Sequence, residues 1–185
     1  MRDMEIREKD PNFDPMGMFF AEVNGKPVGM VNAFVDRKRE EKKGFVYSLC
    51  VVPEFRRRGI GRELVSKAFQ SLRERGMDAA EAEWVRGDKP ACRFFESLGF
   101  SLIRVQSDMR AGLDKVLSNI GEYKGLKIRL MEKNLDNIKL LNDLVNETFK
   151  EHFDFRPGTV EETEWWVLEN PWTDIAEFYL GYVGD

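Results

Sequence analysis

Residues 45–61 read FVYSLCVVPEFRRRGIG and contain a strand, a stop, a basic turn and the start of a helix. Residues 45–52 are apolar, β-branched or aromatic, which predicts a buried strand that Pro53 ends. From Ile60 onward apolar residues recur at helical spacing, which predicts a helix beginning near Gly59. The first N–H groups of a helix lack internal partners, so this turn can bind an anion such as a diphosphate.

Glycine and arginine give the turn its chemistry. Gly59 and Gly61 carry no Cβ, so a phosphate can approach the backbone closely, and the arginines at 56–58 supply charge that does not titrate. The alternative is an ordinary strand-to-helix turn with a solvated basic edge, and these residues alone do not separate the two. A Walker-type nucleotide site is disfavoured because no Gly-Lys-Ser/Thr follows the glycines.

Composition limits the classes of function. The chain has 185 residues, 42% of them hydrophobic, and a formal net charge of −4. We therefore expect one domain, with room for part of another, and neither a general nucleic-acid surface nor a membrane segment. Cys50 and Cys92 lie in apolar stretches, which predicts reduced core residues and a cytoplasmic protein. The single His152 has no neighbour at ligand spacing, so no metal site is expected.

The residues around this stretch predict further strands and a short helix. Residues 18–23 and 27–35 are predicted to form a hairpin, and the charged run 37–43 a solvated tip. Residues 79–85 are predicted to form a strand, and Asp88 to open a helix. Gly87 precedes that helix, Gly99 ends it, and residues 100–113 return to strand character.

The order hairpin, strand, Arg-x-x-Gly-x-Gly helix and strand is followed by Asp88-x-x-Ala91-x-x-x-Phe95-x-x-x-Gly99-Phe100. This order resembles the GNAT superfamily of acyl-CoA-dependent N-acyltransferases over about residues 15–113. The resemblance implies an α/β (mixed α+β) fold with a splayed mixed β-sheet flanked by helices, and acetyl-CoA as cofactor. It also implies an N-acetyltransferase that moves an acetyl group by direct attack of a primary amine, either a small molecule or a peptide N-terminus.

The resemblance also implies roles for particular residues. Backbone groups of Leu49, Cys50 and Val51 are expected to bind the pantetheine arm, and Cys50 is favoured as a core residue over a nucleophile. Asp88 can bond to the same arm or simply cap its helix. The diphosphate is expected at Arg56, Arg57, Arg58, Gly59, Ile60, Gly61 and Arg62.

Two positions bear on turnover. Glu83 falls where ribosomal-protein-type N-terminal acetyltransferases have a glutamate general base, with Glu81 as the fallback; the alternative is a solvent-facing strand glutamate. Phe95 stands where many members have a tyrosine that protonates the departing thiolate, and it is also expected near the cofactor. Since phenylalanine donates no proton, the alternative function is a non-turnover acyl-CoA-binding or assembly module.

The second part of the chain has its own pattern. Residues 1–113 are predicted to form the acyl-CoA-binding body and residues 114–125 a linker. Residues 126–185 follow as strand, helix, helix and strand, with the two helices capped by Asn134 and by Thr159 with Glu162. Trp165 and Trp166 on the second helix are expected in a core or interface rather than against an acceptor.

A shift of 160 aligns the two ends of the chain without a gap. The matched pairs are Asp10 with Asn170, Pro11 with Pro171, Asp14 with Asp174, Phe19–Phe20 with Tyr179–Leu180, Val23 with Val183, and Asn24–Gly25 with Gly184–Asp185. The chain therefore resembles a window cut from a tandem acetyltransferase of the mycothiol-synthase type, with the opening of a second copy placed after the body. We expect residues 126–183 to dock on residues 15–113, within one chain as in a circular permutation or between two chains as a homodimer by segment exchange.

Overall fold

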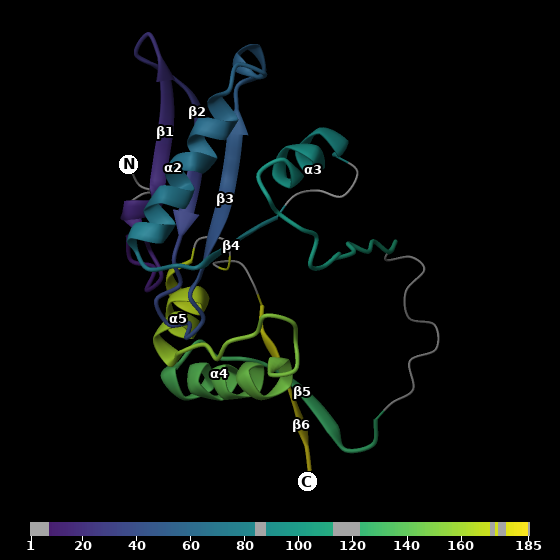
Figure 1. Cartoon of the computed structure of the whole chain (residues 1–185). Helices are drawn as coiled ribbons and strands as arrows, with labels where there is room; N and C mark the ends of the chain where they lie inside the picture. The colour runs from purple at the N-terminus through teal and green to yellow at the C-terminus, as the bar shows by residue number, and fades with distance from the viewer. Residues whose placement is uncertain (1–7, 84–87, 113–122, 171–172, 174–176, 185) are drawn as a thin grey trace. The chain divides into compact units, whose positions relative to one another are not determined.

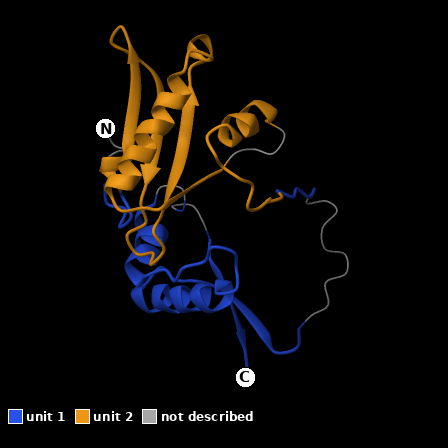
Figure 2. Ribbon diagram, in the orientation of Figure 1, with its two compact units in different colours: residues 1–13, 108–185 blue, residues 14–107 orange. Residues whose placement is uncertain are grey.

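The computed structural model describes residues 8–83, 88–112, 123–170, 173 and 177–184 (Figure 1). The chain divides into two compact units, residues 14–107 and residues 1–13 with 108–185 (Figure 2), and each has its own hydrophobic core. Several predicted features lie outside the described residues: Trp84 and Val85 of the predicted strand, Gly87, positions 114–122 of the predicted linker, and Pro171, Asp174 and Asp185 of the alignment. No described helix is long and apolar enough to cross a lipid bilayer.

Residues 14–107 form a four-stranded mixed sheet with the strand order β1-β2-β3-β4. The strands β1 (Met18–Val23), β2 (Lys26–Phe34) and β3 (Lys43–Val51) are antiparallel neighbours, and β4 (Ala79–Ala82) runs parallel to β3. The helix α2 (Ile60–Glu74) connects β3 to β4 and lies across one face of the sheet (Figure 1). This architecture confirms the predicted mixed α/β class.

The predicted hairpin is present, with Asn24 and Gly25 as its two-residue turn. Their φ angles are 53° and 74°, as a type I′ turn requires, and this turn twists in the sense that suits a β-hairpin. The strand bounds match the predicted ranges to within a residue on this side of the sheet.

The core of this unit lies between α2 and the sheet. Leu64, Ala68 and Leu72 recur on one side of α2 and pack against buried strand residues such as Val31 and Val46. The helix begins where the pattern predicts, with Gly59 as its N-cap. Burial of this apolar stripe positions the start of α2 directly beyond the end of β3.

A β-bulge in β3 reverses which residues face α2. Ser48 has a positive φ of 54°, and the register between β2 and β3 shifts beside it. After the bulge Leu49 and Val51 pack against the α2 core, while Cys50 is exposed. The prediction that Cys50 is a core residue is therefore wrong, because strict alternation along the strand ignores the extra residue of a bulge.

The helix α3 (Lys89–Glu96) has the predicted cap, since the Asp88 side chain accepts a hydrogen bond from the Ala91 N–H at 3.0 Å. The predicted strand at 100–113 is wrong for its described part, because residues 101–112 form no helix or strand. Leu102 and Ile103 are exposed there. An apolar run becomes a strand only beside a neighbouring strand, and these residues pair with none in the described structure.

The tip between β2 and β3 is less solvated than its charge predicts. Asp36 is 8% exposed and pairs with Arg39 at 3.4 Å, while the Arg39 guanidinium lies over the Phe45 ring. Nearby, Arg75 at the end of α2 forms an ion pair with buried Asp14 and donates to the Ala33 carbonyl at 2.5 Å. The charged run thus contributes folded contacts as well as a solvated surface.

The second unit packs helices on one face of a two-stranded sheet. The strands β5 (Leu126–Leu130) and β6 (Tyr179–Val183) are antiparallel. Between them come α4 (Leu135–Phe149), α5 (Val160–Glu164) and the π-helical turn η3 (Trp165–Glu169). The buried core of the unit consists of Met131, Ile138, Leu141, Val167 and Leu180.

Both predicted helix caps are present in this unit. The Asn134 side chain accepts from the Asn137 N–H, and Thr159 with Glu162 forms a complete capping box. Glu162 also pairs with Arg156 through two hydrogen bonds of 2.6 and 3.0 Å. Burial would raise the pKa of the Glu162 carboxyl, but the hydrogen bonds from Arg156, the Thr159 N–H and Asn12 hold this pKa well below its ordinary 4.5.

Replacing Glu162 tests this network through its pH dependence. Because the folded-state pKa lies below the unfolded one, the carboxylate stabilises the fold above pH 4.5, and this contribution is lost as the pH falls below that value. We expect Glu162→Gln to lower the free energy of unfolding at pH 7 by about 1–2 kcal/mol, measured by urea denaturation. The difference in the free energy of unfolding between Glu162→Gln and wild type should become smaller at acidic pH.

Glu161→Gln is the matched control, because Glu161 is exposed in the same helical turn. It should change stability by only a few tenths of a kcal/mol. A Glu162→Gln effect that is independent of pH would contradict the assignment.

Candidate functional site

The candidate site is the turn that joins β3 to α2. A short 3-10 turn, η2 (Pro53–Phe55), follows β3, and the chain then reverses through Arg57 and Gly59. Their φ angles are 62° and 89°, both in the left-handed region. Left-handed Gly59 is followed directly by right-handed helical Ile60, and such a pair directs successive N–H groups toward one side, as in an anion-binding concavity.

The N–H groups at the start of α2 are free to bind a ligand. Arg62 and Glu63 both donate to the Gly59 carbonyl, at 2.9 and 3.1 Å. Within the described part of the chain, the N–H groups of Gly59, Ile60 and Gly61 have no acceptor. These unpaired donors carry the positive end of the helix dipole.

The two glycines have different surroundings. A Cβ at Gly59 would meet no atom of the described residues within 4 Å, so within this part of the chain the space above Gly59 is open. A Cβ at Gly61 would lie 3.6 Å from the Phe94 ring of α3, an ordinary packing distance. The close approach expected of a phosphate is therefore open at Gly59, whereas Phe94 covers the Cβ side of Gly61.

The four arginines of the turn are held differently. Arg56 donates from Nε to the Val51 carbonyl at 2.9 Å, and the Arg58 guanidinium lies 5.1 Å from the Phe55 ring centre. Arg62 donates to the Ser97 hydroxyl at 3.3 Å. The guanidinium of Arg57 is exposed and has no partner among the residues that the structure describes. Arg57 is thus the cation most available to an incoming anion.

The end of β3 has an open edge beside the turn. β3 and β4 pair only from Lys43–Ala79 to Val46–Ala82, and beyond Val46 no described strand continues on that side. The predicted residues Leu49, Cys50 and Val51 lie in this unpaired part of β3. In a strand every second residue directs its N–H and C=O away from the paired neighbour, so this edge offers backbone groups to an extended ligand.

The two candidate bases have separate environments. Glu81 lies in β4 opposite Phe45, on the sheet face away from α2, and pairs with Lys43 at 3.0 Å. Glu83 follows the end of β4 and is exposed. The Glu81 carboxylate is already in contact with Lys43, whereas Glu83 is exposed, so of these two residues Glu83 is the better placed candidate.

Asp88 and Phe95 both have structural roles on α3. Asp88 caps the helix, while Phe95 is 5% exposed and packs edge-on against Phe94 and Phe100 at 5.5 and 5.1 Å. On the same helix the Cys92 thiol donates to Glu96, which raises the pKa of that thiol. The ring of Phe95 is therefore committed to the packing of α3 against the chain that follows it.

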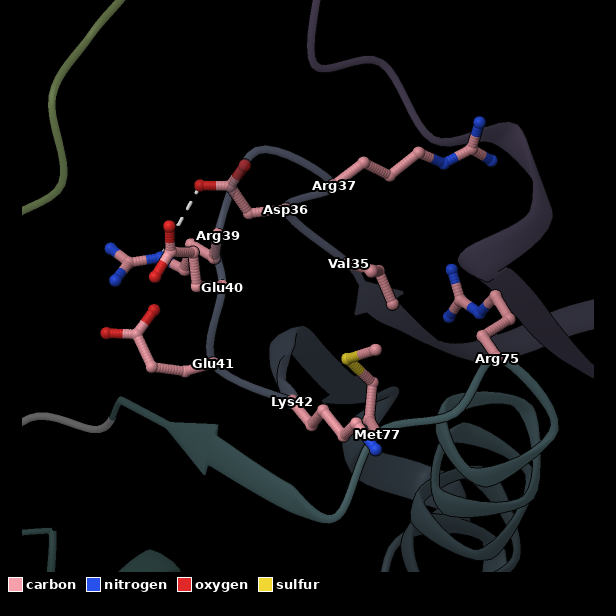
Figure 3. A pocket seen from close by; sticks show the side chains of 9 residues that line it. All are labelled: Val35, Asp36, Arg37, Arg39, Glu40, Glu41, Lys42, Arg75 and Met77. Carbon is pink, nitrogen blue, oxygen red and sulfur yellow. Dashed lines mark ion pairs between the residues drawn. The ribbon is translucent and has the colours of Figure 1, made fainter.

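A concave surface of about 400 Å³ lies at the start of β3, the opposite end of that strand from the turn (Figure 3). Charged side chains of both signs surround it, including Asp36, Arg37 and Arg75. None of the predicted site residues lines it. We therefore assign the candidate site to the glycine turn and the open edge of β3.

Some residues that shape this site have no signature in the sequence. Phe55, Ser97 and the Val51 carbonyl each hold one arginine, and Lys43 holds Glu81. Ser97 and Lys43 are distant in sequence from the residues they hold, and Val51 acts through its backbone carbonyl. Phe55 is close in sequence to the arginine it contacts, but its ring contact belongs to no motif. No sequence signal pointed to the pair of Lys43 and Glu81, because Lys43 belongs to the charged run predicted as a solvated tip, whereas the structure places it at the start of β3.

A sequence model described as the Acetyltransferase (GNAT) family matches residues 2–100, just over half of the chain. The chain belongs to the GNAT acetyltransferase family. This finding confirms the resemblance inferred from the two motifs, and it supports acetyl-CoA as the cofactor.

Curated relatives include a mycothiol acetyltransferase of Thermomonospora curvata, 34% identical over 101 residues that cover 55% of this chain and 33% of the relative. An uncharacterised N-acetyltransferase of Methanocaldococcus jannaschii is 37% identical over 91 residues, 47% of this chain and 40% of the relative. The chain thus matches well under half the length of these relatives. A solved structure named as a transcriptional regulator from Bacillus halodurans shares the fold, with a TM-score of 0.50, 23% identity, and coverage of 60% of this chain and 73% of that one.

The turn fits the diphosphate of acetyl-CoA. Among the described residues, the N–H groups that have no acceptor, the space above Gly59 and the unpartnered Arg57 guanidinium together match a compact polyanion. The residues that would hold it are therefore those of the turn, with the open β3 edge for the pantetheine arm.

The different attachments of Arg57 and Arg56 generate a test. We expect Arg57→Gln to weaken coenzyme A binding about fivefold in calorimetry without changing stability, because Arg57 has no partner in the described fold. Arg56→Gln should lower stability as well, since it removes the bond to the Val51 carbonyl. Exposed Arg37 at the other end of the sheet is the control, and equal effects of Arg37→Gln and Arg57→Gln on binding would contradict the site.

Proposed function

We propose that the protein is an N-acetyltransferase that transfers an acetyl group from acetyl-CoA to a primary amine by direct attack. The acceptor is a small molecule or a peptide N-terminus. One observation carries the proposal: in the described part of the chain, a glycine turn with unpaired N–H groups and an unpartnered arginine lies at the end of a strand whose edge is open there.

The chain's own groups perform the binding steps. The amides of Gly59, Ile60 and Gly61 with the Arg57 guanidinium hold the diphosphate, while backbone groups of Leu49 to Val51 orient the pantetheine arm. Acetyl-CoA, when bound, supplies an acyl group that is already activated as a thioester. The protein therefore needs chiefly to bring the amine to that group and remove a proton from it.

Glu83 is the proposed proton acceptor. It follows β4, directly beyond the point where β3 and β4 stop pairing, and its side chain is exposed. Glu81 is the less suitable group because Lys43 neutralises it. The nearby sheet face carries the packed rings of Phe34, Phe45 and Tyr47. An acceptor can lie against half-buried Phe34 and Tyr47, since Phe45 is buried beneath Arg39 and Lys43.

A second candidate is an acyl-CoA-binding or assembly module without turnover. The buried Phe95 ring favours it, because it provides no hydroxyl to protonate a departing thiolate. Coenzyme A thiol is a good leaving group, so water can supply this proton and the loss need not stop the reaction.

A thioester-consumption assay against a panel of amines distinguishes the N-acetyltransferase from the non-turnover module. We expect wild type to consume acetyl-CoA with at least one amine, and Glu83→Gln to lower kcat about 100-fold while coenzyme A binding stays unchanged. Glu81→Gln is the matched control, and its kcat should stay within a few fold of the wild-type kcat.

Binding of coenzyme A with no turnover of any amine, in wild type and Glu83→Gln alike, would favour the non-turnover module. Loss of activity in Glu81→Gln but not in Glu83→Gln would move the base to Glu81.

A further inference from the structure

Tyr47 lies where β3 and β4 separate. It is the only tyrosine among residues 14–107, the unit that carries the candidate site. The last pair between the two strands is Val46 with Ala82, so Tyr47 is the first residue of β3 beyond it. The Tyr47 ring is half-buried and stacks on the Phe45 ring, with the ring centres 5.5 Å apart and the planes inclined at 6°. The stacked rings share the sheet face away from α2, since Val46 between them packs into the α2 core.

Glu83, the proposed proton acceptor, has the matching position beyond the end of β4. β3 and β4 are parallel, and Phe45 lies beside Glu81 in their register. Residues two positions apart along a strand share a face, so continuing this register leads to Tyr47 on β3 and to Glu83 beyond β4. The two strands therefore part between a residue whose phenol can donate a proton and a residue whose carboxylate can accept one.

The length of the pantetheine arm brings its sulfur to the same place. A Cβ at Gly61 would lie 3.9 Å from the Val51 side chain, so the amides at the start of α2 are neighbours of the last residue of β3. The arm between the diphosphate and the sulfur of coenzyme A is about as long as four residues of extended chain. An arm that follows the open edge of β3 back from Val51 over this length ends at Tyr47.

Other side chains near this edge fit the sulfur less well as proton donors. Phe95 is buried and has no hydroxyl. Cys50 is exposed, but it is next to Val51 and so meets the arm near the diphosphate. Ser48 is exposed at the bulge, but an aliphatic hydroxyl is a far weaker acid than a thiol. A phenol, with an ordinary pKa of about 10, is much closer to a thiol in acidity.

We propose that Tyr47 is the acid that protonates the departing thiolate of coenzyme A, a role that rests on the proposed acetyl transfer. The amine nitrogen bonds to the thioester carbonyl carbon and loses a proton to the Glu83 carboxylate. As the carbon–sulfur bond breaks, its electron pair stays with the sulfur, which takes the proton of the Tyr47 hydroxyl. Protonated Glu83 then returns a proton to the phenolate through water, so both groups are restored and the products are the amide and the thiol. The hydroxyl that Phe95 lacks is thus supplied from β3.

Removal of the Tyr47 hydroxyl tests the proposal in the full chain. We expect Tyr47→Phe to lower kcat about 30-fold in the thioester-consumption assay, less than a general acid usually contributes, because the thiol of coenzyme A leaves readily. Coenzyme A affinity in calorimetry and KM for the amine should stay within about twofold of wild type, since phenylalanine keeps the ring stack on Phe45. Tyr123→Phe removes a hydroxyl from an exposed ring of the other unit and is the matched control, with the wild-type kcat expected.

The outcomes separate the acid from the acetyl transfer itself. A wild-type kcat in Tyr47→Phe would overturn the proposal and leave the transferase intact. A loss of coenzyme A affinity that accounts for the whole loss of activity would make Tyr47 a binding residue and would overturn the proposal as well. No turnover of any amine by the wild-type chain would instead refute the transferase, and the acid with it.

NMR of the tyrosine rings gives a measurement that needs no turnover. In a chain labelled at its tyrosines, the Tyr47 ring signals are assigned by their absence from Tyr47→Phe. They should shift on titration with coenzyme A and stay in place with ADP, which has the diphosphate but lacks the pantetheine arm. Tyr47 signals that do not move under saturating coenzyme A would contradict the placement of the sulfur at Tyr47, whatever the kinetics.

Discussion

An α-helix cannot satisfy its own first N–H groups, and the site proposed for this protein depends on that constraint. The left-handed conformation of Gly59 turns the chain from β3 into α2, and three amides there have no acceptor among the residues that the structure describes. The helix can hold them there because Leu64, Ala68 and Leu72 fix it against the sheet. The packing of α2 thus sets the position of the donors, and these donors are the reason for proposing an anionic ligand here.

The bulge at Ser48 also shapes the candidate site, because it affects both the packing of α2 and the free edge of β3. It turns Leu49 and Val51 toward α2, which strengthens the core just before the turn. It also lies where β3 stops pairing with β4, so the same stretch that anchors the helix has a free backbone edge. A regular strand would place Cys50, not Val51, against the helix.

Much of this arrangement follows from local chemistry in the sequence. The glycine at the start of α2, the Asp88 cap, the Asn24–Gly25 turn and the Thr159 capping box were all predictable, because each depends on residues within a few positions. The exposure of Cys50 and the coil at 101–112 were not. The first depends on a bulge and the second on whether a neighbouring strand is present, and neither leaves a periodic pattern. The attachment of Arg56 to a backbone carbonyl was equally hidden.

The central claim is that the amides at the start of α2 bind the diphosphate of coenzyme A. The most direct measurement is amide NMR of the isotopically labelled full chain during titration with coenzyme A, and separately with pantetheine, which lacks the diphosphate. The account predicts that the N–H resonances of Gly59, Ile60 and Gly61 shift with coenzyme A and stay in place with pantetheine. Unchanged resonances at these three residues under saturating coenzyme A would contradict it.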